Sequence, residues 1–221
     1  MAGERNHGHG GEPSAGPLGV DASRPPGRMD DVIKVNTTVV AVVAPVGAAP
    51  PLATVSAPNV RVVRPPAEAP PLDRAVTTWN EARHTSSPYL LHDADPLAVV
   101  VDAWVRRFDG SGVAGDLEVA VAETLARWRA RSLDLPDYYL VVDPESLGPT
   151  QRHWYFGVLG AAAPARVVVP AASAPVADHL GELRPGPWWP DMDRLLADVD
   201  HIVPDQAEAF VIPEPARGLV V

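Results

Sequence analysis

Cysteine is absent from the 221 residues of the sequence. Its absence excludes a disulfide framework, a zinc site with thiolate ligands, an iron–sulfur cluster and a cysteine nucleophile. Lysine is almost absent as well, because Lys34 is the only lysine among the 18 basic residues. The dominance of arginine, together with abundant Ala, Val and Pro, is typical of a coding sequence rich in G and C, and we do not interpret it as phosphate recognition. Any catalysis must therefore use oxygen, imidazole or guanidinium groups.

Basic charge is scarce in the part of the chain that carries the net charge. The formal net charge is −10, and residues 73–221 hold twelve basic and 22 acidic side chains, whereas residues 1–72 hold six of each. A surplus of ten carboxylates repels polyanions, and binding to phosphates depends on neutralisation by Lys and Arg. The charge pattern therefore disfavours nucleic acid and anionic lipid as partners.

Long apolar runs without proline are also missing. The first 30 residues are polar and rich in glycine, so they do not form a secretory signal. The uncharged run of residues 35–60 is long enough to span a bilayer, but four prolines and many small or polar residues interrupt it. The sequence thus predicts a soluble, cytoplasmic protein with no membrane partner.

Glycine and proline divide the chain into three parts. Residues 1–28 contain seven glycines and four prolines and almost no apolar side chains, so we expect a disordered arm. Met29, which follows this arm, is an alternative start of the protein. Residues 29–72 contain two stretches rich in β-branched residues, 32–43 and 60–64, separated by prolines; they are either a Pro-rich linker or an edge β-hairpin. We expect residues 73–221 to form a single domain.

Helical periodicity begins within this domain. Six apolar residues recur at spacings of three and four: Leu97, Val100, Val101, Trp104, Val105 and Phe108. Asp95 is a natural N-cap for this helix, Pro96 suits its first position, and Gly110 ends it. A second helix is predicted over residues 116–131, a weaker one over 73–83, and another after Pro190.

Four strands are predicted in the remainder of the domain, over residues 138–142, 154–159, 166–169 and 209–212. The connection between the first two is too short for a crossover helix, so we expect an antiparallel pair. Because helices come first and strands cluster afterwards, the sequence predicts an α+β fold, in which two or more amphipathic helices cover a small, mostly antiparallel sheet.

A candidate metal site follows the strand predicted over residues 138–142. Asp143 and Glu145 are carboxylates at a strand end, which can hold a divalent cation such as Mg²⁺ or Mn²⁺. His153 would face them if the next strand pairs with this one, and it could act as a ligand or as a general base. The alternative is that Asp143 and Pro144 form an ordinary turn and that Glu145 is solvated.

A second cluster of possible ligands, His92, Asp93 and Asp95, precedes the helix predicted around Trp104. Three possible ligands within four residues are compatible with a metal site, but adjacent side chains diverge in a loop. We favour the interpretation that Asp95 is the helix cap.

Two adjacent tryptophans, Trp188 and Trp189, lie between Pro187 and Pro190. Large aromatic side chains next to rigid prolines are effective anchors at an interface. The alternative is that at least one of them fixes the following helix to the core.

The sequence contains no Walker loop, metalloprotease helix or kinase signature. It favours a non-enzymatic accessory or protein-interaction module without a cofactor, with a protein partner. The alternative function is a divalent-metal-dependent hydrolase that uses Asp143, Glu145 and His153, so the sequence leaves open whether the protein is an enzyme.

Overall fold

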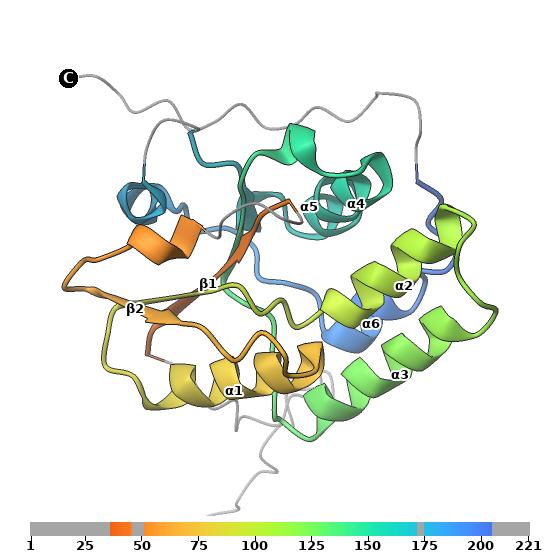
Figure 1. Ribbon diagram of the computed structural model, residues 1–221, viewed down its shortest axis with the longest axis horizontal. Coiled ribbons are helices and arrows are strands. Elements are labelled where there is room, and N and C mark those ends of the chain that lie inside the picture. The colour runs from red at the N-terminus through yellow and green to blue at the C-terminus, as the bar shows by residue number, and fades with distance from the viewer. Residues whose placement is uncertain (1–35, 46–50, 172–174, 205–221) are drawn as a thin grey trace, which may run out of the picture. The chain divides into compact units, whose positions relative to one another are not determined.

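The computed structural model describes residues 36–45, 51–171 and 175–204, which belong to a compact unit of residues 34–221. A five-stranded, all-parallel sheet lies at its centre (Figure 1), in the order β2-β3-β1-β4-β5. The strands are β1 (Thr38–Val43), β2 (Val60–Val63), β3 (Tyr89–His92), β4 (Tyr138–Val141) and β5 (Val167–Val168).

The fold is therefore of the α/β type, and the predicted α+β fold with a mostly antiparallel sheet is wrong. The error arises at Trp154–Leu159, whose aromatic and β-branched residues suggested a strand but form a π-helix, η3. This π-helix continues α4 (Pro149–His153) and leads into α5 (Gly160–Ala162). The connection from β4 to β5 thus contains a helix, which is what a parallel crossover requires.

The two β-branched stretches near the N-terminus are both strands of this sheet, but they do not form a hairpin. β1 lies in the centre between β3 and β4, and β2 lies at the edge beside β3. β3 was not predicted, because it has only four residues and its His92 suggested a loop. The strand predicted over residues 209–212 lies outside the described residues.

The predicted helices agree closely with the structure. They are α1 (Pro71–His84), α2 (Ala98–Phe108), α3 (Asp116–Arg129) and α6 (Met192–Leu196). Short 3₁₀-helices complete the described elements: η1 (Pro51–Thr54), η2 (Pro144–Ser146), η4 (Pro164–Arg166) and η5 (Val176–Glu182).

All the longer helices pack on one face of the sheet, which we call the helix face. From β2 onward each connection leads in the same direction across the sheet, so right-handed crossovers place α1, α2, α3 and α4 on the same side. Only the connection from β1 to β2 leads the other way, and it contains η1. The opposite face is accordingly covered by η1 and, after β5, by η5, through Leu52, Val176 and Leu180.

The central strands are continuous apolar runs because both of their faces are buried in the core. Residues 39–43 of β1 are all buried, because a parallel sheet packs on both faces. The helix face holds the largest cluster, with Trp104 of α2 and Trp154 of η3 completely buried. Trp104 contacts Trp154 edge-on, with ring centroids 5.4 Å apart.

None of the helices in the described part of the chain is long and apolar enough to cross a membrane.

Candidate functional site

The carboxyl edge of an open parallel sheet is the usual place for a ligand, at the point where the connections diverge to the two sides. Here that point lies between β1 and β4. The loop after β1 includes residues 46–50, which lie outside the described residues. Asp143, just beyond the end of β4, and the residues after β3 are described.

The predicted metal ligands Asp143 and Glu145 have partners within the fold. Asp143 adopts a left-handed conformation, with φ at 49°, and its carboxylate accepts a 2.5 Å hydrogen bond from the Ser146 hydroxyl. The Glu145 carboxylate is 2.6 Å from the Arg152 guanidinium. These contacts are those of a turn that closes β4 and begins the crossover to α4.

His153 lies at the end of α4 rather than on a strand beside β4. Its ring stacks on Trp104, with centroids 6.1 Å apart and planes 14° apart. It also covers Gly157, where a Cβ atom would lie only 2.6 Å from its Nε2 atom. In the part of the chain that the structure describes, no three His, Asp or Glu side chains are grouped so that they could hold a metal ion.

His92, Asp93 and Asp95 follow β3, but their side chains point to different partners. Asp93 forms an ion pair with Arg74 of α1, at 2.9 Å. His92 is buried, and desolvation lowers its pKa to about 4, with the nearby Arg74 charge acting in the same direction against a hydrogen bond with the Ala94 backbone. His92 is therefore neutral at physiological pH.

Asp95 is the centre of a polar cluster under the helix face. Its Oδ1 atom accepts hydrogen bonds from the Leu97 amide at 2.8 Å and the Tyr139 hydroxyl at 2.9 Å, and its Oδ2 atom accepts one from the Tyr155 hydroxyl at 3.0 Å. Burial raises the pKa of Asp95 despite these three donors. Burial and the neighbouring Asp95 charge raise the pKa of both tyrosines, which therefore remain protonated donors.

This cluster, which we call the Asp95 cluster, joins three elements. The Leu97 amide belongs to the start of α2, Tyr139 to β4, and Tyr155 to η3. The N-cap role predicted for Asp95 is wrong, because α2 begins at Ala98 with Leu97 at its N-cap position and without a side-chain cap. Asp95 instead accepts a hydrogen bond from the Leu97 amide in the turn that precedes the helix. The two tyrosine partners were not predicted, because they lie 44 and 60 residues away in the sequence.

The two tryptophans have different environments. Trp189 is buried, donates a 2.7 Å hydrogen bond from Nε1 to the Pro136 carbonyl and contacts Tyr139 edge-on. Trp188 is 50% exposed and lies over the Arg166 guanidinium, 4.2 Å from the ring centroid.

Arg166, which no motif in the sequence marks, secures the amino edge of the sheet. Its buried guanidinium donates three hydrogen bonds, to the carbonyls of Asp137, Gly186 and Pro187, at 2.9 to 3.0 Å. It lies between the rings of Trp188 and Tyr138. The segment that leads from η5 to α6 is thereby fixed to the residues preceding β4 and β5.

We expect Arg166→Lys to lower the free energy of unfolding by about 2 kcal/mol, because a lysine cannot reproduce three divergent hydrogen bonds and the flat stacking surface. Chemical denaturation measures this loss. Arg184→Lys, at an exposed neighbouring arginine, is the control and should change stability by less than about 0.5 kcal/mol. Equal effects of the two substitutions would contradict the role of Arg166.

A groove of about 490 Å³ lies along α2 and α3, and Pro71 at the start of α1 also lines it. The two helices lie side by side in Figure 1 and are in close contact. Small or apolar residues form its floor and one end: Pro71, Ala98, Val99, Ala103, Val119 and Ala120. Val119 is 57% exposed, so its apolar side chain is accessible from the solvent. We call this concavity the α2–α3 groove.

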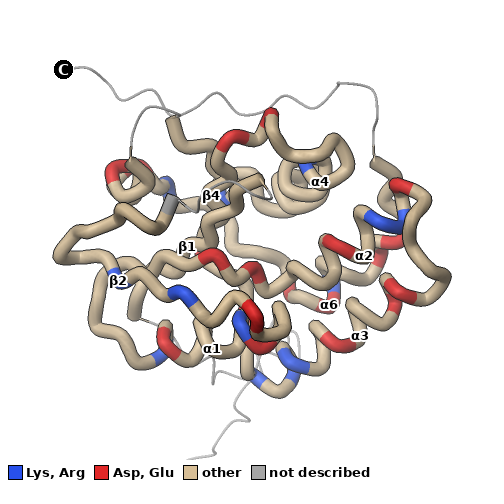
Figure 2. The backbone as a smooth tube through the Cα atoms, viewed as in Figure 1, with Lys and Arg blue, Asp and Glu red and all other residues tan. Residues whose placement is uncertain are grey.

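Charged side chains form the rim of the α2–α3 groove. Three are acidic, Asp102, Asp116 and Glu123, and one is basic, Arg106. Arg106 is shared between two of the carboxylates, at 3.2 Å from Asp102 and 3.7 Å from Asp116. Figure 2 marks the positions of the acidic residues along both helices in red on the backbone.

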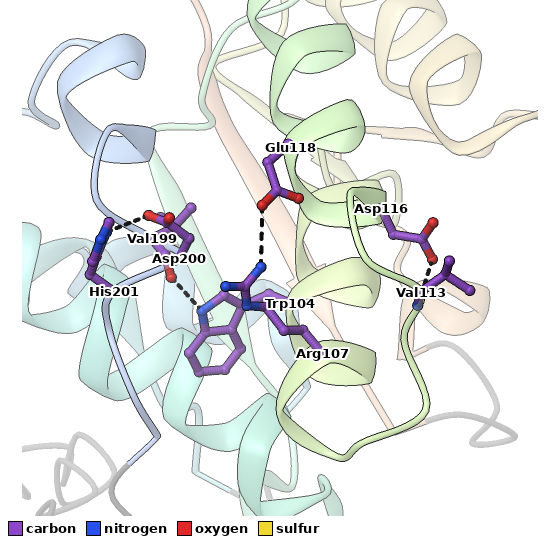
Figure 3. Close-up of polar contacts among 8 residues, drawn as sticks. All are labelled: Trp104, Arg107, Val113, Asp116, Glu118, Val199, Asp200 and His201. Carbon is purple, nitrogen blue, oxygen red and sulfur yellow. Dashed lines mark hydrogen bonds and ion pairs between the residues drawn. The ribbon is translucent and has the colours of Figure 1, made fainter.

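Several contacts join α2 to α3 and to the segment after α6. Figure 3 shows Arg107 of α2 reaching Glu118 of α3, at 3.3 Å, and the Val113 amide donating to Asp116 in the loop between them. The same view shows the Trp104 indole donating a 2.8 Å hydrogen bond to the Val199 carbonyl after α6. These contacts link α2 to α3 and to the segment that follows α6.

Fold and site together define an α/β domain with a one-sided helical layer and an acidic groove on that layer. Comparison of the chain with protein-family models, curated proteins and solved structures finds no match in any of the three.

Proposed function

We propose that this protein is a non-enzymatic protein-interaction module and that the α2–α3 groove is its docking surface. The observation that carries the proposal is the exposed apolar side chain of Val119 beside small residues in a concave surface. A partner side chain that fills such a hollow removes apolar surface from water without requiring the helices to move.

The environment of the ionisable groups near the sheet edge supports a non-enzymatic function. Asp93, Asp95 and Glu145 are engaged by Arg74, by two tyrosines and by Arg152, respectively. Asp93 links the end of β3 to α1, Asp95 links the start of α2 to β4 and η3, and Glu145 forms a surface ion pair with α4. The contacts of these three carboxylates thus have a structural role, which supports the proposal without a catalytic role for them.

The test compares Val119→Glu with Val113→Glu in affinity capture from a lysate of the source cells. Both valines are exposed, at 57% and 72%, but only Val119 lines the α2–α3 groove. We expect Val119→Glu to remove the specific partner from the captured proteins, because it buries a charge against the floor of the groove. Val113→Glu should retain that partner.

Circular dichroism and thermal unfolding serve as controls for this comparison. Because both positions are exposed, each variant should keep a free energy of unfolding within about 0.5 kcal/mol of the parent. Identical captured proteins for both variants and the parent would contradict the proposed docking surface.

A further inference from the structure

The floor of the α2–α3 groove is suited to a helix. Ala98, Ala103 and Ala120 are small, so a third helix can approach to the ordinary interaxial distance of 8–10 Å without a clash. The groove runs between two packed helices, and a ridge of side chains on a docked helix fits into a furrow of that kind.

The rim determines the charge of the occupant. Arg106 is the single cation among the four charged groups of the rim, and it is already shared by Asp102 and Asp116. Glu123, on the exposed side of α3, forms no ion pair with any of the residues that the structure describes. The rim thus carries surplus negative charge, which repels acidic ligands and nucleic acid and attracts Lys and Arg.

We propose that the α2–α3 groove binds an amphipathic helix of a protein partner, with small or medium apolar residues on the inward side and Lys or Arg on its flanks. This inference rests on the proposed function and specifies the partner. The apolar side chains contact Val99, Val119 and the alanines, and the flanking cations approach Asp102 and Glu123.

The experiment selects peptides from a phage-displayed library of helix-forming sequences, using the immobilised full chain as bait. Peptides that also bind a Val119→Gln variant are removed, so the remaining pool depends on the apolar side chain in the groove while the charge of the groove is unchanged. Binding of individual peptides is then measured by fluorescence anisotropy against the parent and against Asp102→Asn/Glu123→Gln. The control, Asp193→Asn/Asp198→Asn, removes two exposed acidic charges outside the groove.

We expect the selected peptides to carry net positive charge and to bind the Asp102→Asn/Glu123→Gln protein roughly three- to tenfold more weakly than the parent, since each exposed ion pair contributes modestly. The control double variant should bind as the parent does, and added salt should weaken binding.

Other results overturn the inference in distinguishable ways. Groove-dependent peptides that are neutral or acidic, with no effect of the rim substitutions, would refute the charge assignment and leave the docking surface intact. Self-association of the full chain that is abolished by Val119→Glu would identify a second copy as the occupant instead. A pool in which no peptide depends on Val119 would refute the helix-binding inference, whereas the capture comparison above decides the proposed function independently.

Discussion

Trp104→Ala is expected to lower the free energy of unfolding by roughly 3 to 5 kcal/mol, the range for large aromatic deletions in a core. Trp104 is completely buried and contacts Phe108, Trp154 and the His153 ring. Removing it leaves a cavity between α2 and η3 and also leaves the Val199 carbonyl without its indole donor. Equilibrium denaturation followed by circular dichroism measures the loss.

Trp104→Phe separates the two contributions. The phenyl ring retains part of the packing but has no donor for Val199, so an intermediate loss of about 1 to 3 kcal/mol is expected. A loss below about 1 kcal/mol for Trp104→Ala would contradict the position of α2 in the core.

Asp95→Ala is expected to lower the free energy of unfolding by about 3 kcal/mol or more. The substitution leaves the hydroxyls of Tyr139 and Tyr155 buried without an acceptor, at about 1 to 3 kcal/mol each, and removes the acceptor of the Leu97 amide in the turn before α2. Asp95→Asn should lose much less, because its amide oxygen can accept from the Leu97 amide and from Tyr139. Comparable losses in the two variants would argue against the hydrogen-bonded cluster.

The difference in the free energy of unfolding between the parent and Asp95→Asn should depend on pH, in a direction that follows from the pKa of Asp95. Burial raises the pKa of Asp95 in the folded protein above its value in the unfolded chain, so the folded state binds the proton more tightly. The stabilisation from Asp95 is thus complete below the unfolded pKa and is lost as the pH rises through the folded pKa. The free-energy difference between the parent and Asp95→Asn should increase in favour of the parent as the pH falls from 7 towards 4. A difference that is constant with pH, or that shrinks on acidification, would contradict the raised pKa.

The helices can be predicted from the sequence because the residues that specify each helix lie within a few turns of one another. The spacing of Leu97, Val100, Val101 and Trp104 places these residues on one side of α2, and all four are buried. For the β-branched run of residues 32–43 the sequence leaves a linker and an edge strand open, and the structure forms the central strand β1 within it. These predictions depend on periodicity and propensity within a dozen residues.

The sheet topology was not predictable in the same way, because it depends on how distant segments pair. The residues of η3 have high strand propensity, but Trp154, Tyr155 and Phe156 are buried in a helical segment by packing against α2 and β4. This packing outweighs their propensity. The propensity of these residues predicts a strand, and the short connection from β4 to that strand predicts an antiparallel pair. The wrong α+β fold class follows from this single element.

The candidate site was only partly visible in the sequence for a similar reason. Trp188 and Trp189 are conspicuous in the sequence, yet Trp189 is a core residue and Trp188 covers Arg166. The α2–α3 groove depends on the relative position of two helices, so no motif marks it. A local signal did exist at Val119, which interrupts the polar side of α3 between Glu118 and Glu123.

Site-specific photocrosslinking tests the central claim most directly. A photoreactive amino acid is placed at position 119 or, as the matched control, at position 113 of the full chain, and crosslinked products are analysed in cells that produce the protein. The docking surface predicts a discrete protein adduct from position 119 that is absent from position 113 and diminished by Asp102→Asn/Glu123→Gln. The same adducts from both positions, or no adduct from position 119, would contradict it.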